Sequence, residues 1–286
     1  MPFLVLLALA VTVGLVVGVV AWKLAPTATV ERARKIGETI GRHASLRAIL
    51  DARLDPATAT GLALTLALAF IVGGGVLFGV LAYLVRTNSH LIGFDNSVAK
   101  WGHAHATALS THGLNAVTSL GSIYTVVVLG VILAVVETIA ERSIWVVPFI
   151  VAVLGGEEIL VLTVKDLADR VRPVFNPAAA TLGPAFPSGH SATAAAFYAT
   201  AALLLGRRSG RRVRAVLAGV AAGIAVAVAA SRVLLDLHWL TDVIAGLMLG
   251  WAWFAVCAIA FGGRILRFGA AASTAARAAK TAPRHT

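Results

Sequence analysis

Cysteine and charge are both scarce in this sequence. The only cysteine among 286 residues is Cys257, so neither a disulfide framework nor a cysteine-based metal site is available. Charged residues make up 13% of the chain and hydrophobic residues 59%, with a mean hydropathy of +0.88. Such a composition excludes an ordinary soluble domain and favours a helical membrane protein.

What is abundant is continuous apolar sequence, rich in Leu, Ala and Val. Several runs approach the length needed to cross a bilayer, and they lack the strict alternation of a β-barrel. They lie at 3–21, 61–85, 120–136, 143–164, 191–205, 215–230 and 243–261. We therefore expect an all-α polytopic membrane protein with a six-helix core over 61–262.

The segments outside this core receive separate predictions. Residues 1–23 are predicted to form an additional N-terminal transmembrane helix, which is favoured over a signal peptide because a basic n-region is lacking. Residues 24–60 are mixed polar and apolar, consistent with either a helix on the membrane surface or a solvated linker. The basic tail 263–286 is predicted to be cytoplasmic and disordered.

Basic residues outnumber acidic ones, 24 against 13, which gives a net charge of +11. If the segment 23–60 is cytoplasmic, so are 137–142, 207–214 and the tail, and this side then holds 18 of the 24 Lys and Arg. The positive-inside rule places the opposite face outside the cytoplasm, in a multi-pass protein of the plasma membrane. The charge is therefore a signal of topology and does not predict nucleic-acid binding.

Three polar signatures interrupt the apolar sequence, all at the extracytoplasmic face. They are Lys165-x6-Arg172-Pro173, Pro187-Ser188-Gly189-His190 and Ser231-Arg232-x5-His238-x3-Asp242. Charged groups close to hydrocarbon are costly and usually functional. A single Lys or Arg at a helix end is explained by snorkelling, but three cations converging on one face predict a pocket for an oxyanion such as phosphate.

The histidines add chemistry to these cations. Ser188 can cap the helix that follows it, Gly189 allows a close approach of the backbone, and free N–H groups there favour an anion beside His190. His238 and Asp242 are neighbours on one helical face, so the carboxylate can fix the imidazole tautomer. Two histidines with three cations are the groups that phosphoryl transfer without a metal requires.

In these motifs the sequence resembles the type 2 phosphatidic acid phosphatase family over about residues 60–262. The resemblance implies that His238 is a nucleophile forming a phosphohistidine, oriented by Asp242, and that His190 is the general acid. It implies a phosphate cradle, and no metal or cofactor. The cradle would consist of Lys165, Arg172, Ser188, Gly189 and Arg232.

The resemblance predicts hydrolysis of a lipid phosphate or pyrophosphate: phosphatidate, phosphatidylglycerol phosphate or a polyprenyl pyrophosphate. Two other functions stay open, transfer of the phosphate to a lipid or sugar acceptor, and anion or lipid transport without chemistry. The substrate would reach the site from the bilayer, and the sequence does not predict the oligomeric state.

Four further features lie outside the signatures. Either Glu157 or Glu158 lines the cavity floor and orients Lys165 or a water, or one of them is a protonated glutamate bonded to a neighbouring helix. Asp236, four residues after Arg232, could pair with it. The polar segment 86–117 is expected to cover the site with partly helical structure; it holds His90, His103, His105 and His112 but no acidic cluster to complete a metal site, and Asp95 stands alone there.

Overall fold

The computed structural model describes residues 2–141 except 24–58, and residues 143–265. Within these ranges the chain is helical and no strand occurs. The long helices are α1 (Pro2–Lys23), α4 (Ala59–Thr87), α7 (Ile123–Glu141), α8 (Val146–Ala168), α9 (Gly189–Gly206), α10 (Arg211–Leu234) and α11 (Leu240–Ile265). The chain is thus an all-α membrane protein, as the apolar runs predict. The predicted surface segment 24–60 and the tail 263–286 lie almost wholly outside the described residues.

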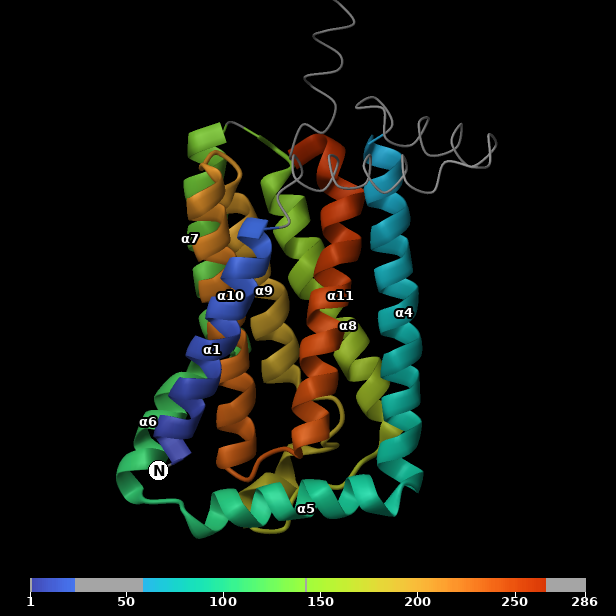
Figure 1. Ribbon diagram of the computed structural model, residues 1–286, viewed down its shortest axis with the longest axis vertical. Helices are drawn as coiled ribbons and strands as arrows, with labels where there is room; N and C mark the ends of the chain where they lie inside the picture. The colour runs from blue at the N-terminus through green and yellow to red at the C-terminus, as the bar shows by residue number, and fades with distance from the viewer. Residues whose placement is uncertain (1, 24–58, 142, 266–286) are drawn as a thin grey trace, which may run out of the picture.

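Five of these helices are long and apolar enough to cross a membrane: α1, α7, α8, α10 and α11. The helix pair Val72–Thr87 and His90–Ala104 passes the same test together but bends by 83° at its break. The second member is α5 (Ser89–Ala104), which lies across one end of the bundle (Figure 1). With α6 (Ala108–Ser119) it makes the polar segment 86–117 helical, as expected for a cover over that end.

The bundle core forms where α7, α8, α9 and α11 meet. Phe149, Phe197 and Leu204 are buried there, with Cys257 among them as an apolar packing residue. Helix α11 approaches α9 very closely, because a Cβ on Gly250 would lie 2.2 Å from the carbonyl oxygen of Ala192. This close contact positions α9 along α11, and the first residues of α9 belong to the second signature.

The N-terminal helix α1 packs along α10 through small residues (Figure 1). A Cβ on Gly14 would lie 2.8 Å from the Gly219 carbonyl oxygen, and one on Gly219 would lie 2.5 Å from the Gly14 carbonyl oxygen. Backbone approach through glycine is a common way for membrane helices to associate. Helix α1 is therefore part of the described bundle, while its retention in the mature protein stays a prediction.

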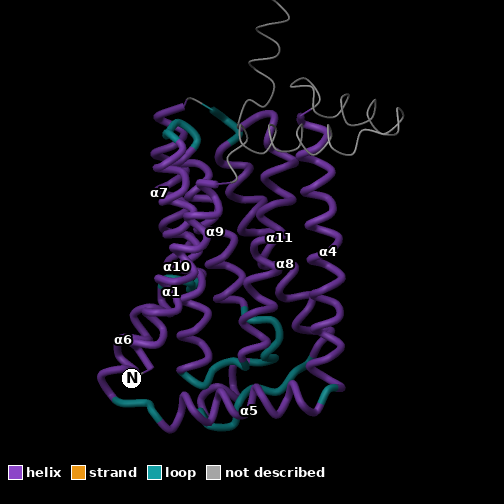
Figure 2. Tube along the Cα trace, in the orientation of Figure 1, coloured by secondary structure: helices purple, strands orange, loops and turns teal. Residues whose placement is uncertain are grey.

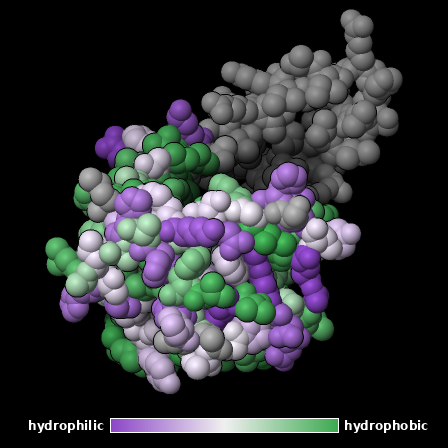
Figure 3. All heavy atoms as spheres, turned by 90° about the horizontal axis from the view of Figure 1, so that it is seen from below, coloured by the Kyte–Doolittle hydropathy of each residue, from purple (hydrophilic) through white to green (hydrophobic). Residues whose placement is uncertain are grey.

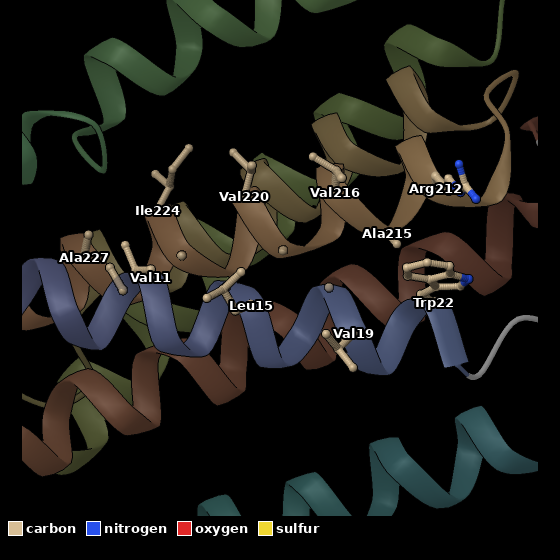
Figure 4. A pocket seen from close by; sticks show the side chains of 15 residues that line it. Val11, Leu15, Val19, Trp22, Arg212, Ala215, Val216, Val220, Ile224 and Ala227 are labelled. Atoms are coloured by element: carbon tan, nitrogen blue, oxygen red, sulfur yellow. The ribbon is translucent and has the colours of Figure 1, made fainter.

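An apolar groove of about 650 Å³ runs between α1 and α10 (Figure 4). Val11, Leu15 and Val19 line it from α1, and Arg212 with Trp22 lies at one end. None of the signature residues lines this groove. Its apolar walls fit its position between two lipid-facing helices.

Candidate active site

The three signatures meet at the end of the bundle that α5 covers. The loops joining α8 to α9 and α10 to α11 both lie there (Figure 2). The first signature closes α8 and enters the following loop, the second opens α9, and the third closes α10 and opens α11. Seen from this end, hydrophilic and hydrophobic side chains are interleaved (Figure 3). The three signatures thus lie at one end of the bundle, as their positions at the ends of the apolar runs predict.

His238 and Asp242 are at the centre of this end and are both buried. The Nδ1 atom of His238 lies 3.5 Å from Oδ2 of Asp242, a long contact, and it makes no hydrogen bond with the described residues. Its Nε2 atom lies 3.0 Å from NH1 of Arg172. Arginine can only donate, so Nε2 must be the unprotonated nitrogen and Nδ1 carries the proton that faces Asp242. This tautomer leaves a lone pair on Nε2.

Burial also keeps the His238 ring neutral. It lowers the pKa of His238 to about 4, against the opposing effect of the Asp242 carboxylate, while the charges of Arg172 and Arg232 lower it further. A neutral imidazole can act as a nucleophile or as a base once its Nε2 lone pair is released from Arg172. The geometry therefore suits the role that the resemblance implies for His238.

Arg172 follows α8 and is 6% exposed. All of its N–H donors are engaged: besides His238 Nε2, they reach the carbonyl oxygens of Leu182, Gly183, Pro184 and Leu237. Burial lowers the pKa of the Arg172 guanidinium, and the Asp242 carboxylate opposes that effect. An anion that binds here must accept hydrogen bonds from some of these donors. Catalysis by His238 first requires that NH1 of Arg172 release the Nε2 atom.

Lys165 and Arg232 supply the other two cations. Lys165, in the last turn of α8, donates to the carbonyl oxygen of Pro184 at 3.3 Å, the same oxygen that Arg172 reaches. Arg232, in the last turn of α10, donates from NH1 to Thr118 Oγ1 at 3.2 Å. Its Nε atom is buried and has no hydrogen-bond partner among the described residues. A buried guanidinium with an unused donor is suited to an anionic ligand.

The second signature forms the start of α9 beside these groups. Ser188 lies at the N-cap, and its backbone N–H donates to the carbonyl oxygen of Asp242 at 3.0 Å. The expected capping bond is absent: the Ser188 side chain accepts a hydrogen bond from Ser191 instead, at 2.9 Å. Gly189 has open space beside it, because an added Cβ would meet only a Val161 methyl group at 3.6 Å. His190 is half-buried, and burial lowers its pKa to about 3, with a further lowering by the charges of Arg232, Lys165 and Arg172.

The two glutamates of α8 differ in burial. Glu157 is fully buried, and the hydroxyl of Thr193 in α9 lies 3.2 Å from one of its carboxyl oxygens. Glu158 is partly exposed, and its charge acts on Lys165. For Glu157 this contact matches the predicted bond to a neighbouring helix, and orientation of Lys165 stays a prediction for Glu158.

Asp236 does not pair with Arg232, so that prediction is wrong. Its Oδ2 lies 2.9 Å from Nδ1 of His103 in α5, whose ring stacks on Phe175. Helix α10 ends at Leu234, and Asp236 has a left-handed backbone with φ of 56°. Burial raises the pKa of Asp236, and the hydrogen bond from His103 opposes this. The pair ties α5 to the loop that holds His238.

Sequence reasoning missed two residues at the site, Asp95 of α5 and Arg170 in the loop after α8. Arg170 donates to Asp242 Oδ1 at 2.5 Å and to Asp95 Oδ2 at 2.8 Å. The sequence offered two signals: Arg170 stands two residues before Arg172, and Asp95 is a lone acidic residue in the covering segment. Across the described part of the chain, no three His, Cys, Asp or Glu side chains are grouped so that they could hold a metal ion.

The chain is similar to known proteins in both sequence and structure. Residues 144–265 match the model of the PAP2 superfamily. The curated phosphatidylglycerophosphatase B of Bacillus subtilis (strain 168) is 36% identical over 114 residues, which are 38% of this chain and 55% of that protein. The chain thus spans about half the length of this relative. The crystal structure of the first transmembrane PAP2 type phosphatidylglycerolphosphate phosphatase from Bacillus subtilis superimposes with a TM-score of 0.62 and 28% identity, over 69% of this chain and 98% of that one.

Proposed function

The chain belongs to the PAP2 superfamily, and on that premise we propose that it is a phosphatase that hydrolyses the phosphate ester of a membrane lipid. The observation that carries the proposal is the state of His238. Its Nε2 atom has a lone pair, its Nδ1–H faces Asp242, and the charges of Arg172 and Arg232 act on its ring. Lys165 joins this group of cations through the Pro184 carbonyl oxygen that it shares with Arg172. An anion pocket with a neutral, oriented imidazole is suited to nucleophilic attack on phosphorus.

In the proposed reaction, the phosphate of the lipid displaces the Arg172 donor from His238 Nε2 and accepts hydrogen bonds from all three cations. The negative charge of the bound phosphate offsets that of the cations and favours a protonated His190. Nε2 then attacks phosphorus, the bond to the lipid oxygen breaks, and the protonated His190 gives that oxygen its proton. Water, deprotonated by His190, attacks the phosphohistidine and releases inorganic phosphate, which returns both histidines to their starting states. Ser188 and Gly189 complete the phosphate cradle at the start of α9.

Phosphatidylglycerol phosphate is the first substrate to test, because both relatives are phosphatases of that lipid by name. Phosphatidate and polyprenyl pyrophosphates carry the same terminal phosphate and are the next two. The asymmetry of basic residues supports an active site on the extracytoplasmic face of the plasma membrane. A lipid in the outer leaflet would then bring its phosphate to the α5 end while its tails stay in hydrocarbon.

The test is phosphate release by the detergent-purified protein on these three lipids, with EDTA present. We expect release by the wild type and a loss of about 10⁴-fold or more in His238→Ala, because removing a nucleophile removes the pathway itself. His112→Ala, which replaces an exposed histidine of α6, is the matched control and should keep wild-type turnover. A folded wild type that releases no phosphate unless an acceptor is added would be a transferase, and His238→Ala with full turnover would overturn the mechanism.

A further inference from the structure

Arg170, at an unspecified position of the first signature, bonds to the carboxylate that faces His238, and Asp95, outside all three signatures, bonds to Arg170. NH1 of Arg170 lies 2.5 Å from Oδ1 of Asp242, and NH2 lies 2.8 Å from Oδ2 of Asp95. Asp95 is 1% exposed and Asp242 is fully buried, so neither carboxylate relies on water. Buried carboxylates that share one guanidinium in this way are strongly held.

Thr241 joins the same network from the first turn of α11. Its backbone N–H donates to Oδ1 of Asp95 at 3.1 Å, and its hydroxyl donates to Oδ2 of Asp95 at 2.5 Å. Arg170 also donates to the Thr241 hydroxyl at 2.7 Å. On its other side, the Arg170 guanidinium lies 5.6 Å from the centre of the Trp239 ring. Arg170 therefore has contacts on several sides that limit its freedom to move.

The two carboxylate oxygens of Asp242 have different partners. Oδ1 takes the hydrogen bond from Arg170, while Oδ2 takes the backbone N–H of Trp239 at 2.9 Å and faces Nδ1 of His238. A carboxylate held at both oxygens cannot rotate away from the imidazole. Its contact with Nδ1 is long, so a small displacement would remove what orients the ring.

We propose that Arg170 and Asp95 are positioning residues for this hydrolysis: they hold the Asp242 carboxylate in the orientation that fixes the His238 tautomer. This role rests on the proposed function. Arg170 acts directly on Asp242, and Asp95 acts on it through Arg170 and Thr241. Because Asp95 belongs to α5, the docking of that helix against the bundle end and the orientation of the nucleophile are linked.

The first experiment separates turnover from binding in single variants, assayed on a short-chain lipid phosphate in detergent. Arg170→Met should lower kcat by about 10²-fold and Asp95→Asn by about 10-fold, with KM within about 2-fold of wild type. Arg170→Lys, which keeps the charge and one donor, should recover part of the loss. Matched controls are Arg86→Met and Asp166→Asn, which replace exposed charges and should keep wild-type kcat.

The second experiment repeats Arg170→Met in an Asp242→Asn background. If Arg170 acts through Asp242, its loss there should cost less than about 3-fold, whereas a residue needed only for folding would cost the same in both backgrounds. The positioning role alone would be overturned if Arg170→Met lowered kcat equally in the two backgrounds, or if Arg170→Met had the same kcat as an active wild type. A folded wild type that releases no phosphate would overturn the proposed function, and the positioning role with it.

Discussion

Both ends of the helix bundle bury arginine, but they treat its charge differently. At the end away from α5, Arg207 forms an ion pair with Glu137, and both side chains are only 7% exposed. Arg208 lies 3.9 Å from the same carboxylate. At the α5 end, Arg172 and Arg232 reach carbonyl oxygens, a hydroxyl and an imidazole, and neither has a carboxylate within ion-pair distance among the described residues.

The difference separates a structural cation from one that awaits a ligand. A buried arginine is tolerated near hydrocarbon when a carboxylate neutralises it, and that pair then joins helices α7 and α9. Cations left without such a partner raise the energy of the unliganded protein and lower it again when an anion binds. Their position beside His238 is what makes the α5 end the candidate active site.

The comparison predicts opposite consequences for the same substitution at the two ends. Arg232→Met should lower kcat/KM by about 10²- to 10³-fold, because one donor to the phosphate is lost. Its thermal midpoint should stay the same or rise, since a cation without a carboxylate partner has been removed. Arg207→Met should leave kcat/KM within about 2-fold of wild type but destabilise the fold by about 2–3 kcal/mol, because the buried Glu137 then keeps only the longer contact with Arg208.

Phosphate release and thermal unfolding in detergent, measured on both variants, check this pair. Glu137→Gln combined with Arg207→Met is the control for the second arm, because it removes the stranded charge and should restore part of the stability. A loss of activity in Arg207→Met that equals the loss in Arg232→Met would remove the distinction between the two ends.

The signature residues could be predicted because each is tied to the end of an apolar run. Lys165 and Arg232 fall in the last turns of α8 and α10, and Asp242 falls in the first turn of α11, so run boundaries alone bring them to one face. Asp95 and Arg170 could not be paired in advance. Their contact depends on α5 folding back across the bundle after the 83° bend, and the hydropathy pattern contains no such information.

Two local predictions failed for reasons that lie in backbone geometry. Asp236 is four residues after Arg232, but the helix stops before it and its left-handed backbone directs the carboxylate to His103. Ser188 occupies an N-cap, but the hydroxyl of Ser191 competes for its oxygen. Spacing rules assume that the helix continues and that no nearer partner exists, and neither condition can be read from sequence.

Two glycines extend the comparison to smaller effects: Gly189 begins α9, and Gly250 of α11 packs against α9. Gly189→Ala should fold normally, because its Cβ would meet only Val161 at 3.6 Å, but it should raise KM by about 10-fold by intruding on the phosphate. Gly250→Ala should destabilise the bundle by about 1–3 kcal/mol, since its Cβ would lie 2.2 Å from the Ala192 carbonyl oxygen. Steady-state kinetics and thermal unfolding of both variants test this, and a Gly189→Ala protein with normal KM would show that the open space is not used by phosphate.

The smallest expected effect concerns pH and the buried state of His238. Its pKa is lowered to about 4 in the folded protein, from about 6.5 in an unfolded chain, chiefly by burial. Between these values the unfolded chain binds the extra proton, so lowering the pH from 7 to 4.5 should destabilise the fold by on the order of 2 kcal/mol through this residue. His238→Gln should lose that part of the pH dependence, whereas His112→Gln, at an exposed position, should keep it. Thermal midpoints at the two pH values give the answer: an equal drop in wild type and His238→Gln would mean that His238 is not buried in its neutral form, and the tautomer assigned from the Arg172 contact would lose its support.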